Sequence, residues 1–158
     1  MRIPRVYLET SVFNFVFADD APDKREDTLR LFEEIRQGKY VPYTSVYVLD
    51  ELRNAPGEKR KKMLQLVEDF NIIVLSTDAN AERIAELYVS EGIIPRKYAA
   101  DATHIAMTST NDLEFITSWN FKHIVKRKTI LLTEEVNTRE GYKRIGIYSP
   151  TEVIEHDE

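Results

Sequence analysis

The sequence predicts an α/β protein, a single-domain three-layer α/β/α sandwich over residues 1–158 with a mostly parallel central sheet. Two observations predict this fold. Short apolar segments rich in β-branched and aromatic residues alternate with segments that have helical periodicity. No internal repeat, low-complexity tract or linker interrupts the alternation. A chain of 158 residues suits one domain of ordinary size and can bury a core without disulfides.

Amino-acid composition, and the residues typical of helix ends, predict the first four elements. RVYL (5–8) is short and apolar, as a strand is. The following SVFNFVF is expected to begin a short helix, with Thr10 or Ser11 as its cap. Residues 20–39 place apolar residues at helical spacing between a proline near the start and a glycine near the end, which predicts a helix. YVPYTS (40–45) has the composition of a second strand.

Helices surround the third strand. Residues 45–57 predict a helix that is capped by the serine at its start and broken by a Pro-Gly pair. Residues 58–70 are amphipathic and predict another helix. NIIVLS (71–76) is a continuous apolar run, so we expect a strand that is buried on both faces. Residues 77–92 predict a helix capped by one of its first two residues and closed by a glycine.

The last third of the chain repeats the alternation. Residues 97–111 predict a helix, and EFITS (114–118) predicts a strand. Residues 120–129 and 130–142 are expected to be helical or irregular. A strand and the start of a short helix are expected within 144–155. Because strands alternate with helices throughout, the sheet is expected to be parallel and covered on both faces.

Composition limits the class of protein. Hydrophobic content of 42% and charged content of 31% are typical of a globular chain, not a disordered one. The absence of cysteine excludes disulfides and thiolate metal sites and favours a reducing cytoplasm. We expect no secretory signal and no membrane span, since no window approaches roughly 18 apolar residues. A net charge of -5 argues against a nucleic-acid coat protein but permits a nuclease with local positive charge.

Three carboxylates lie where an open parallel sheet places its site. Glu9 follows the first strand, Glu51 lies in the helix after the second, and Asp101 heads an otherwise apolar helix. Ligands bind such sheets beyond the carboxyl ends of the strands, at the switch in strand order. Carboxylates gathered there repel one another, and a divalent cation removes the repulsion. Oxygen ligands favour Mg²⁺ or Mn²⁺ over zinc.

Four segments in this order resemble the PIN-domain ribonucleases, of the VapC type found as toxins of toxin–antitoxin pairs. They are VYLETS, TSVYVLDEL, AADATHIAM and FITSWNFKHI, and the closing IYSPTEVIE is similar as well. The resemblance covers nearly the whole chain. It implies the doubly wound α/β/α fold and an endoribonuclease that depends on Mg²⁺ or Mn²⁺. It places catalytic residues at Glu9, Glu51, Asp101 and Asn120, with the first three as metal ligands.

Two positions depart from the family pattern. Glu9 stands where the family usually has an aspartate, and its extra methylene extends the reach of the carboxylate. Asn120 stands where the family has a further acid; it offers an oxygen but no charge. We therefore expect one well-held cation, with a second arriving with the substrate phosphate. The cation would lower the pKa of a bound water, which attacks phosphorus in line.

RNA is expected to bind mainly through its backbone phosphates. Lys122, Lys126 and Arg127 are candidates on the rim, although a basic cluster is also typical of a solvated helix face. Thr10 and Ser11 have two interpretations, as ligands of a phosphate or as helix caps. Single-stranded loops are the expected targets, because exposed bases are easier to recognise there.

Several site residues have a plainer structural interpretation. Glu9 taken alone is also consistent with a loop carboxylate. Asp50 competes with Glu51, since adjacent residues on a helix point about 100° apart, and the family motif favours Glu51. His104, one turn after Asp101, is expected to be a structural histidine that orients Asp101 or another group around the site.

The resemblance also implies partners: an RNA substrate, a cognate antitoxin that covers the acidic pocket, and a second copy in a homodimer. The competing function is a PIN-like module that binds RNA or protein without cleaving. A third hypothesis, an aspartyl phosphatase or receiver-like domain, is disfavoured because LETSV lacks the D-x-D pattern of those phosphatases. Trp119 is expected in the core rather than stacked on a base.

Overall fold

A five-stranded, all-parallel sheet forms the centre of the protein, and it confirms the predicted α/β/α sandwich. The structure is a computed structural model that describes residues 2–156. The strand order is β3-β2-β1-β4-β5. The strands are β1 (Arg5–Leu8), β2 (Val41–Ser45), β3 (Ile73–Leu75), β4 (Phe115–Thr117) and β5 (Gly146–Tyr148).

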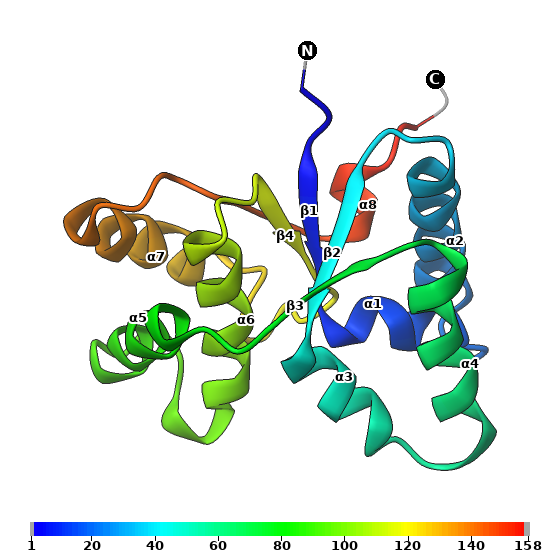
Figure 1. The fold of residues 1–158 in the computed structure, drawn as a ribbon, viewed down its shortest axis with the longest axis horizontal. Helices are drawn as coiled ribbons and strands as arrows, with labels where there is room; N and C mark the ends of the chain where they lie inside the picture. Colours follow the sequence, from blue (N-terminus) through cyan, green and yellow to red (C-terminus); the bar gives the residue numbers. More distant parts are fainter. Residues whose placement is uncertain (1, 157–158) are drawn as a thin grey trace.

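Helices cover both faces of this sheet (Figure 1). One layer contains α1 (Thr10–Phe15), α2 (Pro22–Arg36), α3 (Val46–Arg53) and α4 (Gly57–Asp69). The other contains α5 (Ala79–Ser90), α6 (Ala99–Thr110) and α7 (Arg127–Glu140), and a short 3₁₀ turn (Arg96–Tyr98) precedes α6. The short α8 (Pro150–Val153) packs against α2. Within residues 2–156, no helix is both long and apolar enough to cross a bilayer.

The order of the strands fixes where a site can form. The chain begins in the middle with β1, adds β2 and β3 on one side, and then adds β4 and β5 on the other. The direction of winding therefore reverses between β1 and β4, which is where ligands bind in open parallel sheets. Leu8 of β1 pairs with Thr117 of β4, so Glu9 and Ser118 leave the sheet side by side.

The two central strands carry the core. Val6, Tyr7 and Leu8 of β1 and Ile116 of β4 are fully buried, since they have strands on both sides and helices above and below. Burial of this kind is the main source of stability, and it makes the carboxyl ends of these strands a rigid platform.

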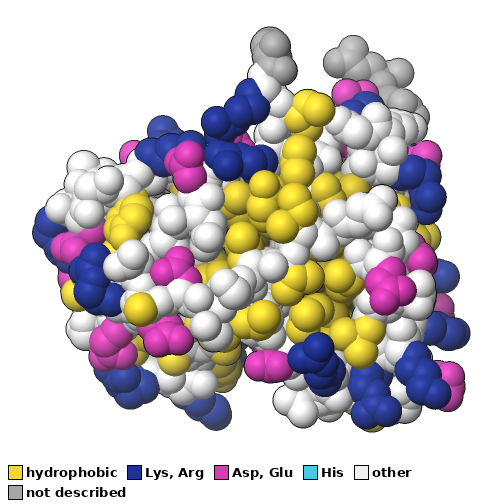
Figure 2. Space-filling view, viewed as in Figure 1, with side chains coloured by type: hydrophobic (Ala, Val, Ile, Leu, Met, Phe, Trp, Pro, Cys, Tyr) yellow, Lys and Arg dark blue, Asp and Glu magenta, His cyan; other side chains and the backbone are white. Residues whose placement is uncertain are grey.

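The prediction that residues 71–76 form a strand buried on both faces is wrong. The strand exists as β3, but it lies at the edge of the sheet and pairs with β2 alone. Ile73 is 44% exposed and Val74 is 37% exposed. Figure 2 shows hydrophobic side chains gathered on the face of the molecule where β3 lies. A continuous apolar run indicates burial only for an interior strand, and the sequence does not reveal strand order.

Local details correct the expected start of α1. Neither Thr10 nor Ser11 caps the helix; the N-cap is Glu9, whose side chain makes no capping bond. The expected caps of α3 and α5 are confirmed, because Ser45 accepts from the N–H of Val48 and Asp78 accepts from the first turn of α5. Residues 121–126 form turns and bends, and regular helix resumes only at the start of α7.

Two isoleucines offer a matched test of the layer assignment. Ile116→Ala, in central β4, is expected to lower the free energy of unfolding by about 2–5 kcal/mol, because the buried side chain leaves a cavity. Ile73→Ala, at the exposed edge, is expected to cost less than about 1 kcal/mol. Urea titration of both variants measures the difference. Equal losses in the two variants would contradict the assignment of β3 to the edge.

Candidate metal centre

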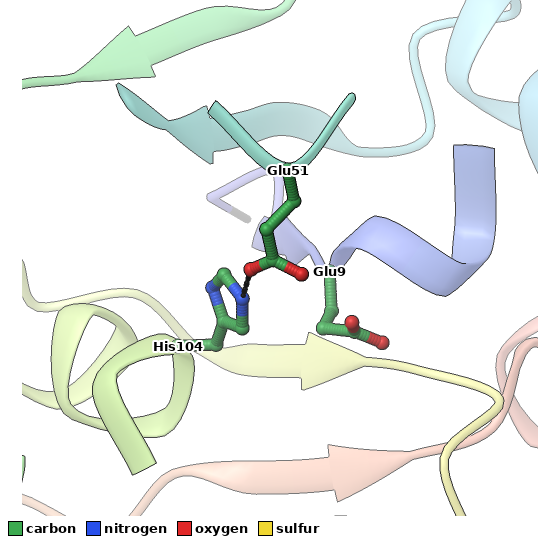
Figure 3. A group of neighbouring side chains, drawn as sticks. All are labelled: Glu9, Glu51 and His104. Atoms are coloured by element: carbon green, nitrogen blue, oxygen red, sulfur yellow. Dashed lines mark hydrogen bonds and ion pairs between the residues drawn. The ribbon is translucent and has the colours of Figure 1, made fainter. Parts of the chain in front are cut away.

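Side chains from three segments meet at the carboxyl edge of the sheet (Figure 3). Glu9 follows β1, Glu51 comes from α3 and His104 comes from α6. Each offers one ligand atom, and these atoms all lie within 4.8 Å of one another. Two carboxylate oxygens and one imidazole nitrogen at this spacing are a donor set that a divalent cation can accept.

The carboxylate of Glu9 is buried and oriented. The residue is 5% exposed. Its Oε1 accepts hydrogen bonds from the hydroxyls of Ser11 at 2.6 Å and Ser118 at 2.5 Å. Its Oε2 accepts no hydrogen bond from any residue between 2 and 156. One oxygen therefore fixes the side chain, and the other remains for a ligand.

Glu51, rather than its neighbour Asp50, reaches the site. Its Oε1 lies 2.5 Å from Nε2 of His104, and its side chain is 40% exposed. Asp50 points to solvent and pairs with Arg53 of the same helix at 3.3 Å. The helical offset between adjacent residues accounts for this division, which agrees with the choice of Glu51 made from the motif.

A chain of hydrogen bonds through buried side chains leads from Ser45 through Tyr7 and His104 to Glu51. The Tyr7 hydroxyl lies 2.7 Å from Nδ1 of His104 and 2.7 Å from Oγ of Ser45. Ser45 also caps α3, the helix that carries Glu51. The sequence indicated Ser45 only as a helix cap, and it did not indicate Tyr7 as part of the site. The available signal was the period of two in a strand, which sends Tyr7 to the same side as Glu9.

The environment of His104 favours its charged form. Burial lowers the pKa of the ring, but the hydrogen bond to Glu51 and the negative charges of Glu51, Glu9 and Asp101 outweigh burial and raise it above the ordinary value. When the ring is protonated, both of its nitrogens donate hydrogen bonds, one to Glu51 and one to Tyr7. A cation that takes a nitrogen of His104 as a ligand must therefore displace a proton.

Asp101 lies beside the ligand group but is not a member of it. Its pKa is raised from 3.8 to about 6, first by burial and then by the charges of Glu9 and Glu51; His104 and a hydrogen bond from Asn120 act in the opposite direction. The structure thus brings Glu9 and Glu51 within reach of one ion, with His104 as the third neighbour. The charges of Glu9 and Glu51 raise the pKa of Asp101, but Asp101 is not among the residues that offer a ligand atom to that ion.

Asn120 holds Asp101 rather than offering a free oxygen. Its Nδ2 donates to Oδ2 of Asp101 at 3.2 Å. Its Oδ1 accepts from the backbone N–H groups of Lys122 and His123 at 3.1 and 2.9 Å. The expected ligand oxygen is therefore already used to close the turn after β4.

The remaining expected residues divide into two groups. Ser11 binds Glu9 and accepts from the N–H of Trp119, whereas the Thr10 hydroxyl is buried with no hydrogen-bond partner in the described structure. Three basic residues are exposed and form no ion pair within residues 2–156: Lys122, Lys126 and Arg127. Trp119 is 6% exposed, which confirms its expected place in the core.

Comparison with known proteins adds no assignment: no family model matches the chain, and no curated protein matches it. The resemblance to PIN-domain ribonucleases therefore stays a prediction. The chemistry of the site is the basis for a functional inference.

A thermal shift measures whether the acids hold a cation. Mn²⁺ or Mg²⁺ at about 100 times its dissociation constant is expected to stabilise the protein by about 2.7 kcal/mol, or roughly 5–10 °C in Tm. Glu9→Gln and Glu51→Gln are expected to lose most of this shift. Asp50→Asn, the adjacent exposed acid, serves as the control and is expected to keep it. Equal shifts in all variants would place the cation elsewhere.

Asp101 gives the metal-free protein a specific pH dependence. Its folded pKa lies above the unfolded value, so the folded state binds the extra proton and stability falls as pH rises from about 4 to about 6. Asp101→Asn removes that loss. In EDTA the variant is expected to be about 1 kcal/mol more stable than wild type at pH 7.5, after allowance for solvent screening, and equal to it near pH 3.5. Thermal unfolding across this range, with Asp50→Asn as control, checks the sign.

Proposed function

We propose that the protein is a metal-dependent endoribonuclease that resembles PIN-domain toxins. The observation that carries this proposal is the convergence of Glu9, Glu51 and His104 within 4.8 Å, with Asp101 adjacent. A carboxyl group whose pKa is raised by burial and by neighbouring acids, as that of Asp101 is, is typical of a functional site. Their position at the switch point between β1 and β4 is the position where open parallel sheets bind ligands.

The donor set fits Mg²⁺ or Mn²⁺. Oε2 of Glu9 is free, and Glu51 is partly exposed. Oxygen donors suit these hard cations. Burial and then the charges of Glu9 and Glu51 raise the pKa of Asp101, and the cation would offset the effect of those charges. When bound, such a cation supplies Lewis acidity toward a phosphate oxygen and a water of lowered pKa.

The residues of the chain have distinct parts in the proposal. Glu9 and Glu51 hold the cation, and Ser11 and Ser118 fix the direction of Glu9. Asp101 has a pKa of about 6, so near neutral pH it can accept a proton from an attacking water.

The basic residues beyond β4 provide the substrate contacts in this proposal. Lys122, Lys126 and Arg127 are exposed next to the turn that Asn120 closes. They suit the backbone phosphates of RNA, which supply most of the binding free energy of such proteins without specifying sequence. Toxin status, an antitoxin over the acidic pocket, a homodimer and a cytoplasmic location belong to the same proposal.

A binding module without catalysis is the second candidate. Two observations favour it. Glu51 is already engaged by His104 at 2.5 Å, and the Asn120 oxygen is used by the backbone. Such a module would bind RNA or protein at the same edge but would not cut it.

RNA cleavage separates the two candidates. Wild-type protein is expected to cleave unstructured RNA when Mg²⁺ or Mn²⁺ is added and to be inactive in EDTA. Asp101→Asn is expected to lower the rate of cleavage by about 100-fold or more, because the amide cannot accept a proton from the attacking water. Gel analysis of labelled RNA measures both effects, with Asp50→Asn as the active control. RNA binding without cleavage under any divalent cation would favour the module.

A further inference from the structure

Three aromatic rings surround a lysine beside the acidic site. The Lys24 ammonium lies 5.5 Å from the ring centroid of Phe15, 5.6 Å from that of Trp119 and 5.4 Å from that of Phe121. The rings also contact one another: Trp119 is 5.6 Å from Phe15 and 6.1 Å from Phe121, centroid to centroid. We call these four residues the aromatic cluster.

Hydrogen bonds tie the cluster to the acids. The Trp119 indole N–H donates to the Thr28 hydroxyl at 2.8 Å, and that hydroxyl donates to the carbonyl of Lys24. The backbone N–H of Trp119 donates to Ser11, whose hydroxyl donates to Glu9. The position of the cluster relative to the buried carboxylate is therefore set by a short chain of contacts.

Phe121 is exposed to solvent, and the charge on Lys24 faces aromatic rings rather than an acid. Phe121 is 47% exposed, whereas Trp119 is 6% exposed. Lys24 forms no ion pair with any acid in residues 2–156. An exposed aromatic ring beside an unpaired cation is the combination that single-stranded nucleic acids use, with bases on rings and phosphates near cations.

A second aromatic pair flanks Asp101. Tyr98 and His123 are nearly stacked, with ring centroids 4.1 Å apart and an angle of 30° between the planes. The ammonium groups of Lys97 and Lys122 each lie 5.8 Å from the Tyr98 ring. Tyr98 directly precedes α6, the helix that carries Asp101. His123 lies in the same turn as Phe121, and its backbone N–H donates to Asn120. The turn after β4 therefore contributes a ring to each of two groups of rings and cations, Phe121 to one and His123 to the other.

We propose that Phe121 is a stacking platform for an unpaired base of the RNA, with Lys24 facing the phosphate of the same or the neighbouring nucleotide. The inference rests on the proposed nuclease function and specifies its substrate as single-stranded at the cut. A base inside a duplex is already stacked on its neighbours, so it cannot reach the ring. Phe121 directly follows Asn120, which binds Asp101, so the stacked base lies next to the phosphate at the acids.

Two probes of equal length and charge test the platform. One is an oligoadenylate of about ten nucleotides, and the other is the matching abasic oligomer, which keeps the riboses and phosphates. Both are titrated in EDTA, so that no cleavage accompanies binding. Wild-type protein is expected to bind the oligoadenylate about tenfold more tightly. Phe121→Ala is expected to bind both probes as weakly as wild type binds the abasic oligomer.

Matched variants separate stacking from charge and from folding. Leu131→Ala removes an apolar side chain of similar exposure, 45%, on α7, and it is expected to keep the wild-type affinities. Phe121→Trp is expected to restore the preference for bases. Lys24→Ala is expected to weaken the binding of both probes equally, and to reduce the salt dependence of that binding by about one ion. Trp119 fluorescence reports the folding of the three alanine variants, since the wild-type chain has one tryptophan, and circular dichroism reports the folding of Phe121→Trp.

The outcomes distinguish this inference from the nuclease proposal. The platform would be overturned if wild-type protein bound the two probes with equal affinity. It would also be overturned if Phe121→Ala lost the same affinity for both probes. Either result would count even if the protein cleaves RNA. If binding depends on the bases and on Phe121 but no divalent cation supports cleavage, the stacking proposal holds and the nuclease proposal is wrong.

Discussion

The burial of a carboxylate at the end of the central strand is the constraint on which the site depends. Glu9 is 5% exposed, and an ionised group without water requires compensation. Hydroxyls of Ser11 and Ser118 supply part of it. Ser11 lies in the same segment as Glu9, but Ser118 follows β4, so its part of the stabilisation requires that β1 and β4 are paired. The geometry of the site is thereby linked to the assembly of the sheet.

The same constraint extends to the other side of the site. Asp101 and Glu51 add negative charge, and His104 opposes it. The ring of His104 is held by Tyr7, and Tyr7 is held by Ser45 at the start of α3. A core strand, a helix cap and an acid are thus joined through one line of hydrogen bonds, and such networks fix side chains more firmly than isolated pairs do.

Sequence patterns predicted the layers and most of the acids for identifiable reasons. Strand composition and helix caps are local properties, so β1, β2 and the start of α3 could be assigned directly. The motif placed Glu9 and Glu51 correctly at one edge. Tertiary relations escaped prediction, because strand order decides the exposure of β3, and backbone turn geometry decides that Asn120 binds Asp101. The Tyr7–His104 contact joins residues 97 positions apart, which no local pattern reveals.

The edge strand β3 has a consequence for behaviour at high concentration. Apolar edges with unpaired backbone groups are templates for further strands, and proteins usually block them with lysine, proline or bulges. β3 has none of these within Ile73–Leu75; its protection is its length of three residues. So short a segment offers few amide groups to an incoming chain. The shortness of β3, rather than charge, is therefore the feature that limits pairing of this edge with another chain.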